Sequence, residues 1–93
     1  MSIETLASKY ITSAEQVLLE MERVHSSMTV DAEKIDAILE HVRAYLDDAK
    51  YYKTQKRFET SLTSVAYCEG LLDTLRLLGA VKFEWPTNQE EQK

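Results

Sequence analysis

The sequence predicts an all-α fold, a three-helix up-down-up antiparallel bundle followed by a short extended C-terminal segment. The 93 residues include 2 glycines and 1 proline, so the chain is poor in the residues that make turns. Apolar residues recur at alternating spacings of three and four, which is typical of amphipathic helices. Two short connections between three such helices make neighbouring helices antiparallel.

The composition predicts one small domain, which we place at residues 1–86, followed by a polar tail at 87–93 that we expect to be disordered. Sixteen acidic and eleven basic residues give a net charge of -5, which argues against nucleic acid and anionic membranes as partners. We expect a cytoplasmic protein, because a single cysteine allows no internal disulfide and neither a signal peptide nor a membrane span is evident.

The first helix is predicted at about residues 2–26, with Ser2 as its N-cap. Its apolar stripe continues to Met28 and is widened on its flanks by Leu6, Ile11 and Leu18. The stripe consists of Ile3, Ala7, Tyr10, Ala14, Val17, Met21, Val24 and Met28.

The second helix is predicted at about residues 31–53. Asp31 is a suitable N-cap, and Val30 and Ile35 can form a hydrophobic staple across it. The apolar stripe of this helix comprises Ile35, Ile38 or Leu39, Val42, Tyr45 or Leu46, Ala49 and Tyr52.

The boundary between the second and third helices is marked by phase, since neither glycine nor proline separates them. A continuous helix from Asp31 to Leu78 is the alternative. Continuing the second stripe would place Lys56 and Glu59 in the core, whereas the next apolar series begins at Phe58. We therefore predict a break between Lys53 and Arg57, with Thr54 as a possible cap of the new helix.

The third helix is predicted at about residues 56–78. Its apolar face comprises Phe58, Leu62, Val65, Cys68, Leu72 and Leu75. Gly79 follows where a left-handed C-cap is expected. Val81, Phe83 and Trp85 then alternate with charged residues, which predicts an extended segment that ends at Pro86.

Gly70 indicates a candidate interaction face, because a glycine inside a helix costs about 1 kcal/mol relative to alanine. Small neighbours on that side would let the backbone of another helix approach closely; a tolerated surface glycine is the alternative. The candidate face comprises Thr63, Ala66, Tyr67, Gly70, Asp73, Thr74 and Leu77.

A candidate polar site is formed by Glu69, Asp73 and Arg76, which share one side of the third helix. Paired carboxylates can bind a metal ion, but metal centres in helical bundles draw acids and histidines from several helices, so a surface ion pair between Asp73 and Arg76 is the favoured interpretation. His25 and His41 fall on different predicted helices with no Cys or His at ligand spacing, and Cys68 has no histidine placed to activate it. We therefore expect no enzyme activity and no cofactor or metal.

A basic segment at residues 50–57 contains four cations and no acid. Cations beside tyrosines can contact phosphate or single-stranded RNA. The favoured interpretation is structural, because lysines near a helix C-terminus complement its dipole. The cations are Lys50, Lys53, Lys56 and Arg57, with Tyr51 and Tyr52 between them.

The third helix also resembles a known family. The run from Tyr67 to Asp73, which reads Tyr-Cys-Glu-Gly-Leu-Leu-Asp, is followed by Leu78, Gly79 and Trp85 and preceded by Asp48, Ala49, Tyr51 and Tyr52. Over roughly residues 47–85 this is similar to the small archaeal family named domain of unknown function 357, whose members are short, all-helical and cytoplasmic. The family often has a Gly-Asp-like turn after the second helix, where this chain has Thr54, Gln55 and Lys56.

The resemblance implies no activity. If the family shares a site, the matching positions are Tyr67, Glu69, Gly70 and Asp73. The leading hypothesis is a non-enzymatic interaction module that docks another helix, in a homodimer or on a different protein. The alternatives are a small-ligand or metal-binding accessory to an enzyme that uses Glu69 and Asp73, and a weaker one of phosphate or RNA contact through residues 50–57.

Overall fold

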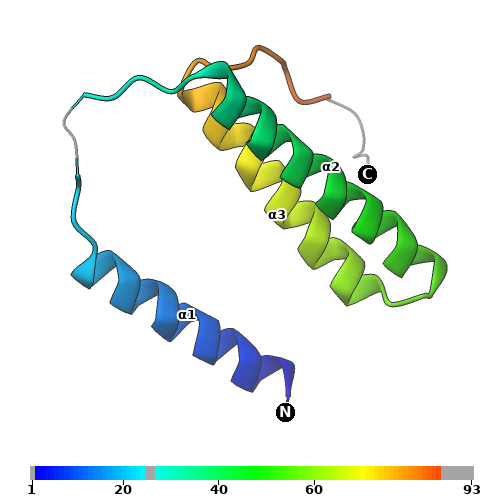
Figure 1. The fold of residues 1–93 in the computed structure, drawn as a ribbon. Coiled ribbons are helices and arrows are strands. Elements are labelled where there is room, and N and C mark those ends of the chain that lie inside the picture. Colours follow the sequence, from blue (N-terminus) through cyan, green and yellow to red (C-terminus); the bar gives the residue numbers. More distant parts are fainter. Residues whose placement is uncertain (1, 25–26, 87–93) are drawn as a thin grey trace.

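The computed structural model describes residues 2–24 and 27–86, and that part of the chain contains three helices and no strand. These are α1 (Ile3–Glu20), α2 (Ala32–Thr54) and α3 (Phe58–Leu77). Figure 1 shows α1 and α3 running in the same general direction and α2 running the opposite way. The predicted all-α fold with up-down-up helices is therefore confirmed. The predicted tail at 87–93 and His25 lie outside the described residues.

The core lies between α2 and α3, which pack antiparallel along most of their length (Figure 1). Val42 and Ala49 of α2 and Cys68 and Leu75 of α3 are buried, and Leu75 is only 1% exposed. The remaining members of the predicted α2 stripe are half-buried around them, except that Leu46 is exposed. The hydrophobic pattern therefore identifies the inner face of α2 correctly.

The inner face of α3 differs from the prediction in its first half. Phe58 and Leu62 are exposed, and Ser61 and Ser64 are half-buried in the positions next to α2. The Ser61 hydroxyl donates a hydrogen bond to the Ala49 carbonyl oxygen at 2.7 Å. A small polar residue therefore lies at this crossing, because it lets the helices approach closely and still satisfies its own hydroxyl.

The first helix does not pack into the core as the sequence predicts. Among the described residues, no Cα atom of α1 lies within 8 Å of a Cα atom in α2 or α3. None of its residues is buried, and only Leu6 is half-buried. The two helices α2 and α3 thus shield each other's stripes, whereas the stripe of α1 remains exposed.

The first helix is also shorter than predicted. It ends at Glu20, and Met21 has an extended backbone with ψ 152°, whereas the sequence predicts helix to residue 26. Glu20 and Glu22 place negative charge at the C-terminus of the helix, and its last turn contains no basic residue. This arrangement is unfavourable with the helix dipole, and no packing partner offsets it.

The predicted caps of α1 and α2 are confirmed. The Ser2 hydroxyl accepts a hydrogen bond from the backbone N–H of Thr5 at 3.0 Å, and the Asp31 carboxylate accepts one from the N–H of Lys34 at 3.1 Å. Each side chain satisfies one of the free N–H groups in the first turn of its helix.

The break between α2 and α3 is made by Lys56, which has a left-handed backbone with φ 61°. Its N–H donates to the Lys53 carbonyl, and the N–H of Arg57 donates to the Tyr52 carbonyl, which together form a Schellman cap. The guanidinium of Arg57 lies over the Tyr52 ring at 4.9 Å from its centroid. Thr54 is the last residue of α2 and does not cap α3, so that part of the prediction is wrong.

The end of α3 repeats this cap with the residue that the sequence predicts. Gly79 has φ +80°, its N–H donates to the Arg76 carbonyl, and the N–H of Ala80 donates to the Leu75 carbonyl. The chain continues without regular structure, and Val81, Phe83 and Trp85 are half-buried. Residues 81–86 alternate between half-buried and exposed, as the sequence pattern of an extended segment predicts.

We predict that Lys56→Gly stabilises the protein. A non-glycine residue pays about 1–2 kcal/mol in the left-handed region, and glycine costs about 0.5–1 kcal/mol in additional chain entropy. The net gain expected is therefore up to about 1 kcal/mol, measured as a higher urea midpoint at an unchanged slope. Lys56→Ala is the matched control, since it removes the same charge but keeps the strained backbone. Equal midpoints for the two variants would contradict the prediction.

Candidate functional site

The Gly70 face of α3 comprises Thr63, Ala66, Tyr67, Gly70, Thr74 and Leu77, and all six are exposed. A Cβ atom built on Gly70 has no neighbour within 4 Å. The hydroxyls of Thr63 and Thr74 donate to the backbone carbonyls of Glu59 and Gly70, so they are satisfied within the helix. The resulting surface is smooth and has few free polar groups.

Tyr67 fixes one edge of this face against α2. Its ring lies 4.5 Å from the ring of Tyr45, centroid to centroid, with the two planes tilted by 58°. Such tilted contacts contribute about 0.5–1.5 kcal/mol beyond burial. The face is therefore held at a fixed orientation by the core.

Asp73 was predicted to belong both to the interaction face and to the polar site, and the structure places it in the polar cluster. Its carboxylate accepts a hydrogen bond from the indole N–H of Trp85 at 2.8 Å and pairs with the Arg76 guanidinium at 3.4 Å. The ion pair that the sequence favoured is confirmed, and it is partly exposed. Glu69 lies one turn earlier and is exposed.

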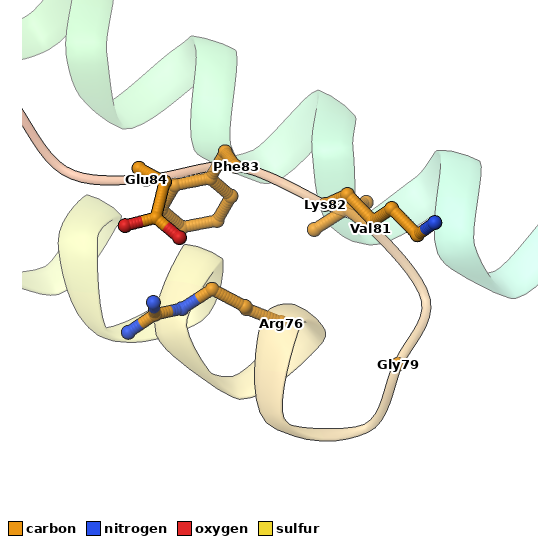
Figure 2. Close-up of a pocket in the computed structure, with 6 residues that line it drawn as sticks. All are labelled: Arg76, Gly79, Val81, Lys82, Phe83 and Glu84. Carbon is orange, nitrogen blue, oxygen red and sulfur yellow. The ribbon is translucent and has the colours of Figure 1, made fainter.

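The C-terminal segment covers this side of α3. Figure 2 shows the chain turning back after Gly79 and running alongside α3, with the Phe83 ring facing Arg76 and the Lys82 side chain directed away. The Arg76 guanidinium lies 5.1 Å from the Phe83 centroid, and Phe83 meets Trp85 edge to face at 4.9 Å. Arg76 lies between the aromatic ring and the Asp73 carboxylate, so its charge is largely used within the chain.

An apolar cleft of about 660 Å³ opens where the start of α2 meets the end of α3. We call it the end cleft. It is lined mainly by aliphatic side chains from three parts of the chain, and it includes the staple residues Val30 and Ile35. The lining residues are Met28, Val30, Lys34, Ile35, Ile38, Leu75, Leu78, Gly79 and Ala80.

A smaller cleft of about 400 Å³ lies between α1 and α3. We call it the side cleft. Side chains of α1 and α3 both line this cleft. The lining residues are Ile3, Leu6, Ala7 and Tyr10 of α1 with Glu59, Thr60 and Thr63 of α3.

The basic segment forms the turn at the opposite end of the hairpin from the end cleft. Lys50, Lys53, Lys56 and Arg57 are all exposed. Lys53 lies in the last turn of α2, and Arg57 stacks on Tyr52. Two of the four cations thus have structural positions of the kind that the sequence favoured.

Cys68 and His41 lie as the sequence predicts. The Cys68 side chain is buried, with 4% of the residue exposed, and His41 is on the surface. Burial, and to a smaller extent the charge of Glu69, raises the pKa of the Cys68 thiol. The thiol is therefore protonated at neutral pH and is a poor nucleophile.

Within residues 2–24 and 27–86, no three His, Cys, Asp or Glu side chains lie close enough together to hold a metal ion. In the same part of the chain, no helix combines the length and the hydropathy needed to cross a bilayer.

The chain belongs to the family described as protein of unknown function (DUF357), whose model matches residues 9–81. The match confirms the resemblance and extends it from the α2 and α3 hairpin into α1. No curated protein and no solved structure matches the chain significantly. The family membership thus assigns no activity to the chain.

The sequence did not indicate three of these contacts, namely Trp85 with Asp73, Phe83 with Arg76 and Tyr45 with Tyr67. The alternation from Val81 to Trp85 indicates an extended segment, but it carries no information about which helix side that segment covers. The end cleft was also missed, because its lining comes from segments far apart in the chain.

We predict that Asp73→Ala exposes Trp85, the sole tryptophan of the chain. Loss of the carboxylate removes the hydrogen bond that holds the indole and should cost about 1–2 kcal/mol of stability. Acrylamide should then quench the tryptophan fluorescence more strongly. Glu69→Ala, one turn away, is the control and should leave quenching unchanged. Equal quenching in the two variants would show that the contact does not hold the segment.

The raised pKa of the Cys68 thiol predicts a loss of stability in alkaline solution. The unfolded chain releases the thiol proton at a lower pH than the folded chain, so the stabilising contribution is complete below the unfolded pKa of about 8.5 and declines above it. The free energy of unfolding relative to Cys68→Ala should fall by at most about 1.4 kcal/mol per pH unit in that range. A pH-independent difference between the two proteins would refute this effect.

Proposed function

We propose that this protein is a non-enzymatic helical interaction module that binds an amphipathic helix on its Gly70 face. The observation that carries the proposal is the open space at Gly70, where, apart from its chain neighbours and the backbone of its own helix, no atom lies within 4 Å of an added Cβ. The packing of α2 on α3 therefore has no need of a glycine at this position. A helix docked on the face would need it, because a side chain there would keep the two backbones apart.

The energetics support the same proposal. Glycine in the helix interior costs about 1 kcal/mol relative to alanine, and an alanine would fit the isolated chain without a clash. The exposed Leu77 and half-exposed Tyr67 provide apolar area at the edges of the face. Between them the satisfied threonine hydroxyls avoid the penalty of burying unpaired polar groups.

The partner is another protein chain or a second copy of this one. We also propose a cytoplasmic location, for which the lone buried thiol of Cys68 gives support, since free cysteines are stable in a reducing compartment.

A ligand site on Glu69 and Asp73 has less support. Asp73 already receives hydrogen bonds from Trp85 and Arg76, so its carboxylate would have to exchange those partners for a ligand. Phosphate contact at the basic turn has exposed cations in its favour, but Arg57 is engaged with Tyr52.

We predict that Gly70→Leu weakens association at least about tenfold, equivalent to 1.4 kcal/mol, while helicity and thermal stability are kept or rise. Association is measured by light scattering over a range of protein concentrations and by capture of partners from an extract of the source cells. Glu69→Leu adds the same side chain to the neighbouring side of α3 and is the matched control. Unchanged self-association together with unchanged capture in Gly70→Leu would remove the proposal.

A further inference from the structure

A single chain in this conformation exposes more surface than a compact domain of its mass. Its accessible surface is 8064 Å², about 2,500 Å² more than the scaling law gives for a folded monomer of 10.7 kDa. The Cα radius of gyration is 16.2 Å, against about 12 Å for a compact domain of this length. An excess of this size is about three times the roughly 800 Å² that each partner contributes to an interface of standard size, and it reaches the range of large obligate dimers.

Much of the exposed apolar surface belongs to α1 and the linker after it. Val24 is 81% exposed and Leu19 is 86% exposed. The apolar surface of α1 is also broader than one docking face can cover, because Ile11 and Leu18 lie beside the stripe. The large exposed side chains of this region are Ile3, Tyr10, Ile11, Val17, Leu18, Leu19, Met21, Val24 and Met28.

The side cleft indicates how α1 fits the Gly70 face. Ala7 and Tyr10 line that cleft together with Thr60 and Thr63, and the two helices run in the same general direction (Figure 1), which allows a register that pairs Ala7 with Thr60 and Tyr10 with Thr63. Because both helices rise by the same distance per residue, the same pairing continues along them. Ala14 then comes opposite Tyr67, Val17 opposite Gly70 and Met21 opposite Thr74. Large side chains thus meet small ones at successive levels, as close helix packing requires.

Charge agrees with this register. Glu4 is in the first turn of α1. In this register it lies at the end of the hairpin where Lys53, Lys56 and Arg57 are exposed. Opposite charges at that end would fix the direction in which the helix docks.

The linker indicates that the docked helix comes from another chain. Residues 21–24 and 27–31 contain no helix, and Met21 and Asp31 both have extended backbones. About ten extended residues reach roughly 33 Å, enough to pass from one hairpin to another. Docking of α1 on its own hairpin would still leave Ile11 and Leu18 in water, whereas a second chain can cover them.

We propose that two copies of this chain exchange α1, each α1 lying on the Gly70 face of the other copy. Such an exchange is reciprocal and closes with twofold symmetry. The inference rests on the proposed function, because it uses the Gly70 face as the docking surface and names a second copy as the partner.

Site-specific cross-linking of the full chain tests the exchange. In a Cys68→Ala background, chains carrying Val17→Cys are mixed with chains carrying Gly70→Cys, unfolded, refolded together and treated with a short bismaleimide. We expect a covalent species of two chains. Leu19→Cys mixed with Gly70→Cys is the matched control and should give none, because Leu19 is on the opposite side of α1. A second pair, Met21→Cys with Thr74→Cys, reports on the same register without altering Gly70.

The outcomes separate this inference from the proposed function. A cross-link that forms only when both cysteines are in one chain, with a single-chain mass by light scattering, would overturn the exchange and leave the Gly70 face as a helix-binding surface. A two-chain mass without a cross-link in either pair would overturn both the exchange and the use of this face. A single-chain mass with no cross-link at all would overturn the exchange and leave the Gly70 face to a helix of a different protein, which the capture experiment with Gly70→Leu tests.

Discussion

The close contact between α2 and α3 is the constraint on which the rest of the structure depends. Small residues contribute to it, since Ala49 and Cys68 are buried and the Ser61 hydroxyl donates a hydrogen bond to the Ala49 carbonyl between the two helices. Among the residues that the structure describes, four are buried, so the core is thin even for a chain of this length. The two Schellman caps secure it, because each reverses the chain within a few residues and so keeps its ends packed.

The hairpin gives its two sides different roles. On one side the segment from Ala80 to Pro86 folds back over α3 and engages Asp73 and Arg76. On the other side the Gly70 face has no such cover, and the end cleft and side cleft open at either end of the hairpin. The chain therefore uses its own C-terminal segment to cover one flank and keeps the other available for a helix.

The sequence predicted the helices better than it predicted their packing. The stripe of α2, the caps at Ser2, Asp31 and Gly79, and the break before Arg57 all follow from local rules that act within one or two turns. Phe58 and Leu62 were wrongly predicted on the inner face of α3, because hydrophobicity alone favours them there over Ser61. The structure has Ser61 at that position, because a small side chain lets the helices approach closely and its hydroxyl bonds to the neighbouring helix. The left-handed Lys56 could not be foreseen, because the glycine that normally marks such a position is absent.

The candidate site shows the same division between local and nonlocal information. Gly70 could be singled out because it breaks a local rule, and its low helix propensity indicates a requirement outside its own helix. Asp73 was assigned to the same face because three-residue spacing places it nearby, but Trp85 draws its carboxylate to the other flank. The position of a residue on a helix therefore limits which neighbours it can have, and the chain that folds over the helix determines which of them it contacts. This is also why α1 has a clear apolar stripe in the sequence, while the identity of the surface that covers it depends on contacts beyond the single chain.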